Sequence, residues 1–153
     1  MAVENRMDKK IKNIIRNYIK SFEEKNEKKV LSYFNDDAIW IAPQYKFMGK
    51  KEIRGYVLWL FENIKDLTFI DDGIGIMVNG NEAVYQHIFK ATIKDVKIKI
   101  PSMFIFKFTG NKFCNQRIMS NWFELTKEIP VKVTIDKIGS IMHMGWNRDY
   151  SNL

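Results

Sequence analysis

The segment 33–56 constrains the fold of this chain more than any other part. It reads Tyr-Phe-Asn-Asp-Asp-Ala-Ile-Trp-Ile-Ala-Pro, and after a short loop it continues as Gly-Lys-Lys-Glu-Ile-Arg-Gly-Tyr. The polar run 35–37 favours a turn, because short Asn and Asp side chains hydrogen-bond to their own backbone. The β-type run 38–41 follows, and Pro43 ends it because proline cannot donate to a sheet ladder. The segment therefore predicts a helix end, a turn, a short strand and then a new helix.

Amphipathic helices lie on both sides of this strand. Before it, apolar residues recur at helical spacing between Ile11 and Phe22, which places them on one face of a long helix. Asn26 suits the N-cap of a short second helix with apolar residues at Val30, Leu31 and Phe34. A third helix is predicted after Gly49, with one apolar face made by Ile53, Val57, Leu60, Phe61 and Ile64.

The remainder of the chain reads as β-sheet. Strand-type runs over 67–78, 83–93, 97–108 and 112–125 are separated by turn residues. Helices followed by a long antiparallel meander predict an α+β fold, in which the N-terminal helices pack on one face of a curved sheet. The alternating tail segment 131–135 would add an edge strand.

No repeat, low-complexity stretch or linker interrupts this pattern. The 153 residues suit one domain. We therefore expect 1–153 to form a single domain, with its core at about 7–125 and a C-terminal extension at 126–153. Within that extension, the apolar segment 138–146 would cover a pocket mouth or pair with another subunit.

Composition argues against several classes of protein. Hydrophobic residues make up 46% of the chain and aromatic residues 14%, which is ample for a packed core. No apolar run approaches the roughly 20 residues that span a bilayer, no signal-peptide stretch opens the sequence, and the lone Cys114 cannot form an internal disulfide. Together these features favour a cytoplasmic location. The net charge of +7 is spread along the chain, which favours a solvated surface over nucleic-acid binding.

The pattern resembles the nuclear transport factor 2-like superfamily, including its polyketide cyclase (SnoaL-like) branch and the steroid delta-isomerases. The resemblance rests on Phe34-Asn35-Asp36-Asp37-Ala38-Ile39, on Pro43 and on Gly49-Lys50-Lys51-Glu52-Ile53-Arg54. It covers about residues 7–125 and implies a cone-shaped α+β barrel, a fold that usually encloses a pocket. Isomerases, cyclases, hydrolases, dehydratases and non-catalytic binders share this fold, so the resemblance does not choose among activities.

The family's reactive positions imply that steroid-isomerase chemistry is absent. The slot of the general-base aspartate, just before the proline, holds Ala42. Tyr18 matches the tyrosine on the first helix that donates to an oxyanion. The second oxyanion donor, a neutral aspartic acid in those relatives, falls near Phe104, which cannot donate a hydrogen bond.

Two residues remain as candidates for catalysis, His87 as a base or donor and Tyr18 as a donor. Each could equally be a core residue. The predicted ligand-binding residues are polar and aromatic side chains that would line an apolar pocket: Trp40, Tyr56, Trp59, Tyr85, Phe104, Gln116, Ser120 and Trp122. On the last strand, either the parity of Gln116 or the parity of Arg117 faces the pocket, because a bulge would exchange them.

The leading hypothesis is a binding protein for a small apolar or aromatic molecule, with a pocket lined by aromatic side chains. The alternatives are a cofactor-independent isomerase, cyclase or dehydratase that uses His87 and Tyr18, and a protein-interaction module. Whether the chain is an enzyme stays open. We expect a homodimer that forms through the sheet, no cofactor and no metal, since only two histidines occur and they lack paired ligand spacing.

Overall fold

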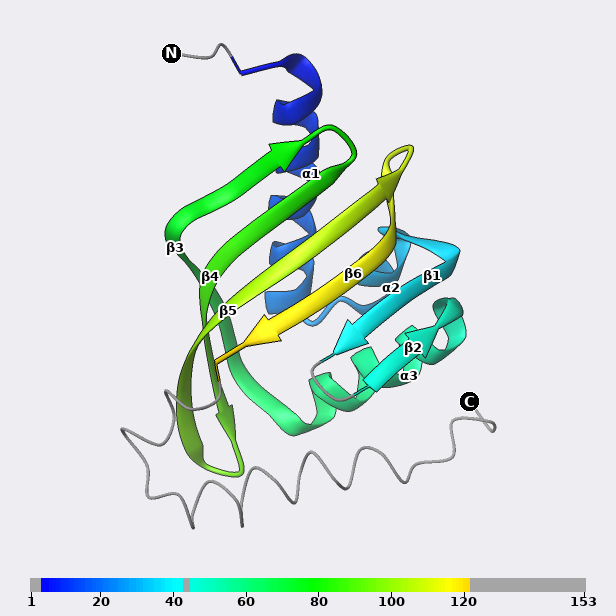
Figure 1. The fold of residues 1–153 in the computed structure, drawn as a ribbon. Helices are drawn as coiled ribbons and strands as arrows, with labels where there is room; N and C mark the ends of the chain where they lie inside the picture. Colours follow the sequence, from blue (N-terminus) through cyan, green and yellow to red (C-terminus); the bar gives the residue numbers. More distant parts are fainter. Residues whose placement is uncertain (1–3, 43–44, 122–153) are drawn as a thin grey trace.

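The computed structural model describes residues 4–42 and 45–121, and in this part three helices pack on a curved six-stranded sheet (Figure 1). Their order along the chain is α1 (Arg6–Glu23), α2 (Glu27–Ser32), β1 (Phe34–Ala42), β2 (Tyr45–Met48), α3 (Gly49–Asn63), β3 (Ile64–Asn79), β4 (Glu82–Ile93), β5 (Val96–Thr109) and β6 (Lys112–Ser120). The α+β class and the helices-then-sheet order are confirmed. The predictions for 131–135 and 138–146 lie outside the described residues.

The sheet has the strand order β2-β1-β6-β5-β4-β3. Each neighbouring pair is antiparallel except β1 and β6, which run parallel. This parallel pair places Trp40 of β1 opposite Gln116 of β6. The early strand β1 therefore pairs with β6, the last described strand of the meander. Helix α3 connects β2 and β3, which lie at opposite edges of the sheet.

The predicted apolar faces of α1 and α3 are the faces that pack on the sheet. Asn5 caps α1 by accepting a hydrogen bond from the backbone N–H of Met7, at 2.7 Å. Along α1, the buried apolar side chains recur with helical spacing: Ile11, Ile15, Tyr18, Ile19 and Phe22. In Figure 1, α1 crosses behind the sheet and α3 lies beside β1 and β2.

Lys25 joins the end of α1 to the junction of α3 and β3. Its ammonium group donates to the backbone carbonyls of Phe61, at 2.7 Å, and Ile64, at 2.5 Å. These carbonyls lie at a helix C-terminus, where free carbonyl groups carry partial negative charge. The contact fixes one edge of the space between α1, α3 and the sheet.

Four predicted details of segment 33–64 are wrong. The run 35–37 is part of β1 rather than a turn, but it bulges: Phe34 pairs with Phe113, and the next pair is Ile39 with Asn115. The extra residues leave the ladder and expose the Asp36 side chain, whose carboxylate forms an ion pair with Lys50 at 3.2 Å. The polar residues 35–37 therefore form a bulge within β1 and not a turn before it.

The other three corrections concern element boundaries. Phe34, expected on the second helix, begins β1 and is fully buried. Residues 45–48 form the edge strand β2, for which four residues give too short a sequence pattern to detect. Ile64 begins β3 instead of ending α3, although it is buried as predicted. Among the described helices, none is long and apolar enough to cross a membrane.

Candidate functional site

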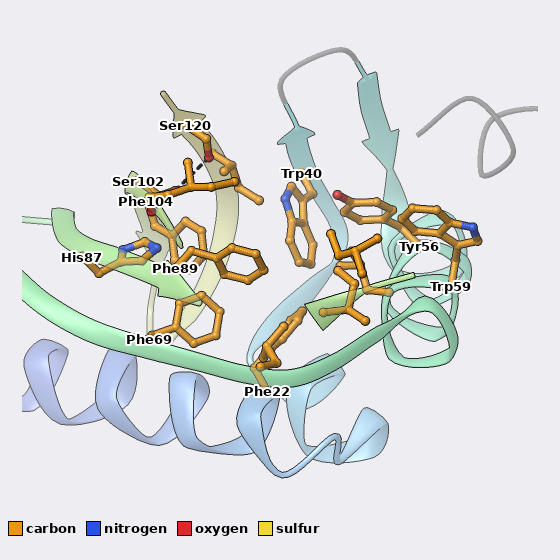
Figure 2. Close-up of a pocket in the computed structure, with 16 residues that line it drawn as sticks. Phe22, Trp40, Tyr56, Trp59, Phe69, His87, Phe89, Ser102, Phe104 and Ser120 are labelled. Carbon is orange, nitrogen blue, oxygen red and sulfur yellow. Dashed lines mark hydrogen bonds between the residues drawn. The ribbon is translucent and has the colours of Figure 1, made fainter. Parts of the chain in front are cut away.

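A cavity lies between α3, the C-terminal end of α1 and the inner face of the sheet (Figure 2). Its volume is about 100 Å³. None of the described side chains around it is an Asp, Glu, Lys or Arg. Its wall consists of Phe22, Trp40, Tyr56, Trp59, Leu60, Ile64, Leu67, Phe69, His87, Phe89, Ile93, Ile100, Ser102, Phe104, Ile118 and Ser120.

The two-residue period of the strands places the polar members of this wall. On β4 the inward face carries Tyr85 and His87, and on β5 the residue opposite His87 is Ser102. Ser102 in turn lies opposite Ser120 of β6, and the two hydroxyl oxygens are 3.0 Å apart. His87, Ser102 and Ser120 of the cavity wall thus come from three adjacent strands.

On β6, the last described strand, the face that carries Gln116 points inward. Gln116 is fully buried and Ile118 and Ser120 reach the cavity, whereas Arg117 and Met119 are exposed on the opposite face. The register between β5 and β6 shifts beside Cys114, because Phe108 pairs with Phe113 but Lys107 pairs with Asn115. This irregularity sets the parity, which explains why the sequence left both choices open.

The structure brings together some of the predicted site residues. The predicted residues that line the cavity are Trp40, Tyr56, Trp59, His87, Phe104 and Ser120. Tyr18, Tyr85 and Gln116 are buried but are not part of the cavity wall. Trp122 lies outside the described residues.

His87 is the one ionisable imidazole in the cavity wall of the described chain, and it is fully buried. Its Nδ1 lies 3.0 Å from the backbone carbonyl oxygen of Tyr85. Burial lowers the pKa of His87 to about 4, while the hydrogen bond to that carbonyl and the Asp71 carboxylate act in the opposite direction. The imidazole is therefore uncharged at neutral pH.

Tyr85 and Asp71, which are not part of the cavity wall, hold the imidazole in place. The Tyr85 ring stacks on His87 with centroids 4.6 Å apart and an angle of 24°. The Tyr85 hydroxyl donates to Asp71 Oδ1 at 3.0 Å, and both carboxylate oxygens of Asp71 accept from the Arg16 guanidinium at 2.5 Å. Arg16 thereby lowers the pKa of Asp71.

Sequence reasoning missed Arg16 and Asp71. Asp71 pairs with His87 across β3 and β4, just before the register shifts between Asp71 and Ile76. Gly73 has a φ of +51°, and a Cβ there would lie 2.5 Å from the amide of Gln86. Two aspartates followed by closely spaced glycines inside a strand run are the signal of such a bulge.

Tyr18 lies in an aromatic cluster that shares Phe22 with the cavity wall. Its hydroxyl donates to Gln116 Oε1 at 2.8 Å, and burial raises its pKa far above the usual range. Five rings surround it at centroid distances from 4.9 to 6.0 Å: Phe22, Tyr33, Phe34, Phe106 and Phe113. The structure therefore does not bring Tyr18 and His87 to one cavity.

Two comparisons support one fold family for this geometry. A family model for the SnoaL-like domain matches residues 15–116. The fold is similar to that of a candidate SnoaL-like polyketide cyclase from Jannaschia sp. CCS1, with a TM-score of 0.73 and 10% identity over 86% of this chain and 99% of that one. No curated protein matches the sequence.

Two further solved structures are similar. One is a protein of unknown function from Burkholderia pseudomallei K96243, described as nuclear transport factor 2-like, with a TM-score of 0.69 and 13% identity over 80% of this chain and 98% of that one. The other is a hypothetical protein from Catenulispora acidiphila with a ketosteroid isomerase-like fold, in complex with trimethylamine. It has a TM-score of 0.63 and 12% identity over 69% of this chain and 83% of that one. At these identities the likeness shows the fold alone.

Proposed function

Since this chain belongs to the SnoaL-like domain family, we propose that it binds a small, uncharged, mainly apolar molecule in the cavity between α3 and the sheet. The observation that carries the proposal is the wall itself, which is aromatic and aliphatic apart from a few hydrogen-bonding groups and has no charged side chain among the described residues. An apolar wall favours an apolar ligand through burial of its surface. A charged ligand would lose its hydration without gaining a counter-charge.

The size of the cavity suits a ligand of about one ring. A single water needs roughly 10–15 Å³ by this measure, and drug-sized ligands occupy sites of about 300–1,000 Å³. The cavity, at about 100 Å³, lies between these limits. An engineered apolar cavity of about 150 Å³ holds benzene. A monocyclic compound therefore suits this space.

Toluene titration tests the proposal. We expect saturable binding, seen as chemical-shift changes of the indole N–H groups and as a rise in Tm with toluene concentration. Ile118→Phe should fill the cavity and weaken toluene binding at least tenfold. Met119→Phe is the matched control, because the neighbouring side chain is exposed on the opposite face. Absence of saturable binding by both toluene and its hydroxyl analogue phenol, or equal toluene binding by the wild type and Ile118→Phe, would contradict the proposal.

A homodimer through the sheet is also proposed, supported by apolar side chains on the outer face. Ile70, Met77 and Met119 are between 41 and 56% exposed on this face, and dimer formation would remove them from water. Light scattering should give twice the 18.2 kDa chain mass, and Met119→Glu should lower it to one chain mass. A monomer at every concentration would contradict the dimer.

The enzymatic alternative gains less support than binding. It needs His87 and Tyr18 at one substrate, whereas the Tyr18 hydroxyl is bonded to Gln116 outside the cavity wall. The interaction-module alternative predicts that side chains fill the cavity. The open cavity of about 100 Å³ beside α3 does not favour this alternative. Binding of a small molecule therefore remains the proposal that the cavity and its apolar wall support best.

A further inference from the structure

The hydrogen-bonding state of His87 follows from its partner. A carbonyl oxygen only accepts hydrogen bonds, so the Nδ1 atom that lies 3.0 Å from the Tyr85 carbonyl must carry the hydrogen. A neutral imidazole has one N–H group. Nε2 therefore has a free lone pair and acts as an acceptor.

This acceptor has no partner among the described residues. Nε2 is buried and makes no hydrogen bond there, although the ring forms part of the cavity wall. Buried polar atoms are nearly always paired, and an unpaired one costs free energy that a suitable partner recovers. Figure 2 shows the imidazole on the side of the cavity occupied by Phe69, Phe89 and Phe104.

Neighbouring groups prevent the imidazole from turning to satisfy Nε2 elsewhere. The Tyr85 ring stacks on one side and the Phe104 ring lies with its centroid 4.4 Å from the imidazole. The Tyr85 ring is itself anchored by Asp71 and Arg16. A rotated imidazole would lose the bond to the carbonyl, so the donor must come to Nε2.

We propose that His87 Nε2 accepts a hydrogen bond from the ligand, so that the cavity selects small aromatic or apolar molecules that carry an O–H or N–H donor, with phenol as the simplest case. This inference rests on the proposed function, because it names the ligand class of the same cavity. His87 is a specificity-determining residue in this account and transfers no proton.

A pair of probes of nearly equal size tests the donor requirement. Phenol and toluene differ by a hydroxyl in place of a methyl group, and burial alone favours toluene because it is the more apolar molecule. We expect the wild type to bind phenol at least tenfold more tightly than toluene. His87→Phe retains an aromatic ring without the acceptor, and it should reverse the preference.

Trp40 supplies the control, because it offers a ligand a hydrogen-bond donor where His87 offers an acceptor. Its Nε1, another buried atom without a partner in the described chain, is a donor and would favour ligands that accept. Trp40→Phe should change both affinities but keep the preference for phenol. If Trp40→Phe removes that preference and His87→Phe does not, the indole selects the ligand and the inference is overturned.

A measurement on the wild type keeps the inference testable if the variants do not fold. Nitrogen NMR of histidine-labelled protein should show the Nδ1–H tautomer for His87, and phenol, but not toluene, should shift its Nε2 resonance. An Nε2–H tautomer or an unmoved resonance at saturating phenol would overturn the inference. If neither probe binds, the proposed function itself fails; if both bind and toluene is preferred, only this inference fails.

Discussion

Phe113→Ala should lower the free energy of unfolding by about 3–5 kcal/mol, the usual cost of deleting a buried phenylalanine ring. The Phe113 side chain is fully buried, and the ring centroids of Tyr18, Phe106 and Phe108 lie 4.9, 4.7 and 5.1 Å from its own. These rings come from α1 and β5, so removal of Phe113 leaves a void where helix and sheet meet. Urea denaturation measures the loss through the midpoint at constant slope.

Phe89→Ala is the matched control for this change. It removes the same ring from β4, but Phe89 is only half-buried and already borders the cavity. We expect a smaller loss, because the cost of such a deletion grows with the burial and the void that it creates. Equal losses for the two variants would show that the cluster around Phe113 is not the stronger part of the core.

Acidification should destabilise the protein by roughly 3 kcal/mol through His87 alone. The folded protein takes up this proton only near pH 4, whereas the unfolded chain takes it up near the ordinary histidine pKa of 6.5. The unfolded state therefore binds more protons between these two pH values. The free energy of unfolding falls as the pH is lowered through that window, by about 1.4 kcal/mol per pH unit. Urea denaturation at a series of pH values measures the fall.

His87→Phe isolates this effect, because the variant should lose the dependence between pH 6.5 and 4. The charged groups near the imidazole are Arg16 and Asp71, and the pKa of Asp71 is lowered from 3.8. The contribution of that carboxylate is therefore present above its unfolded value and is lost only at lower pH. An identical pH dependence of stability in the wild type and His87→Phe would contradict the assignment.

The sequence predicted the features that depend on local periodicity. The strand-type run 83–93 was predicted within one residue of the observed strand β4, Glu82–Ile93. Helical spacing likewise identified the side of α1 that packs on the sheet. These patterns depend only on residues a few positions apart, so a single sequence carries them.

The parts that could not be predicted depend on strand irregularities and on long-range pairing. The Arg16–Asp71 pair joins residues 55 positions apart, and it forms where the register of β3 shifts. The inward parity of Gln116 depends on a second shift, beside Cys114. A bulge of one residue reverses every side chain beyond it, and spacing alone does not locate it.

The parallel pairing of β1 with β6 has a consequence for synthesis of the chain on the ribosome. Tyr18 finds its hydrogen-bond partner Gln116 only 98 positions later, a delay of roughly 5–20 seconds at typical elongation rates. Until then the apolar sides of α1 and α3 have no completed sheet to cover them. High contact order of this kind slows folding, and the apolar surface that stays exposed makes the incomplete chain prone to aggregate until β6 emerges.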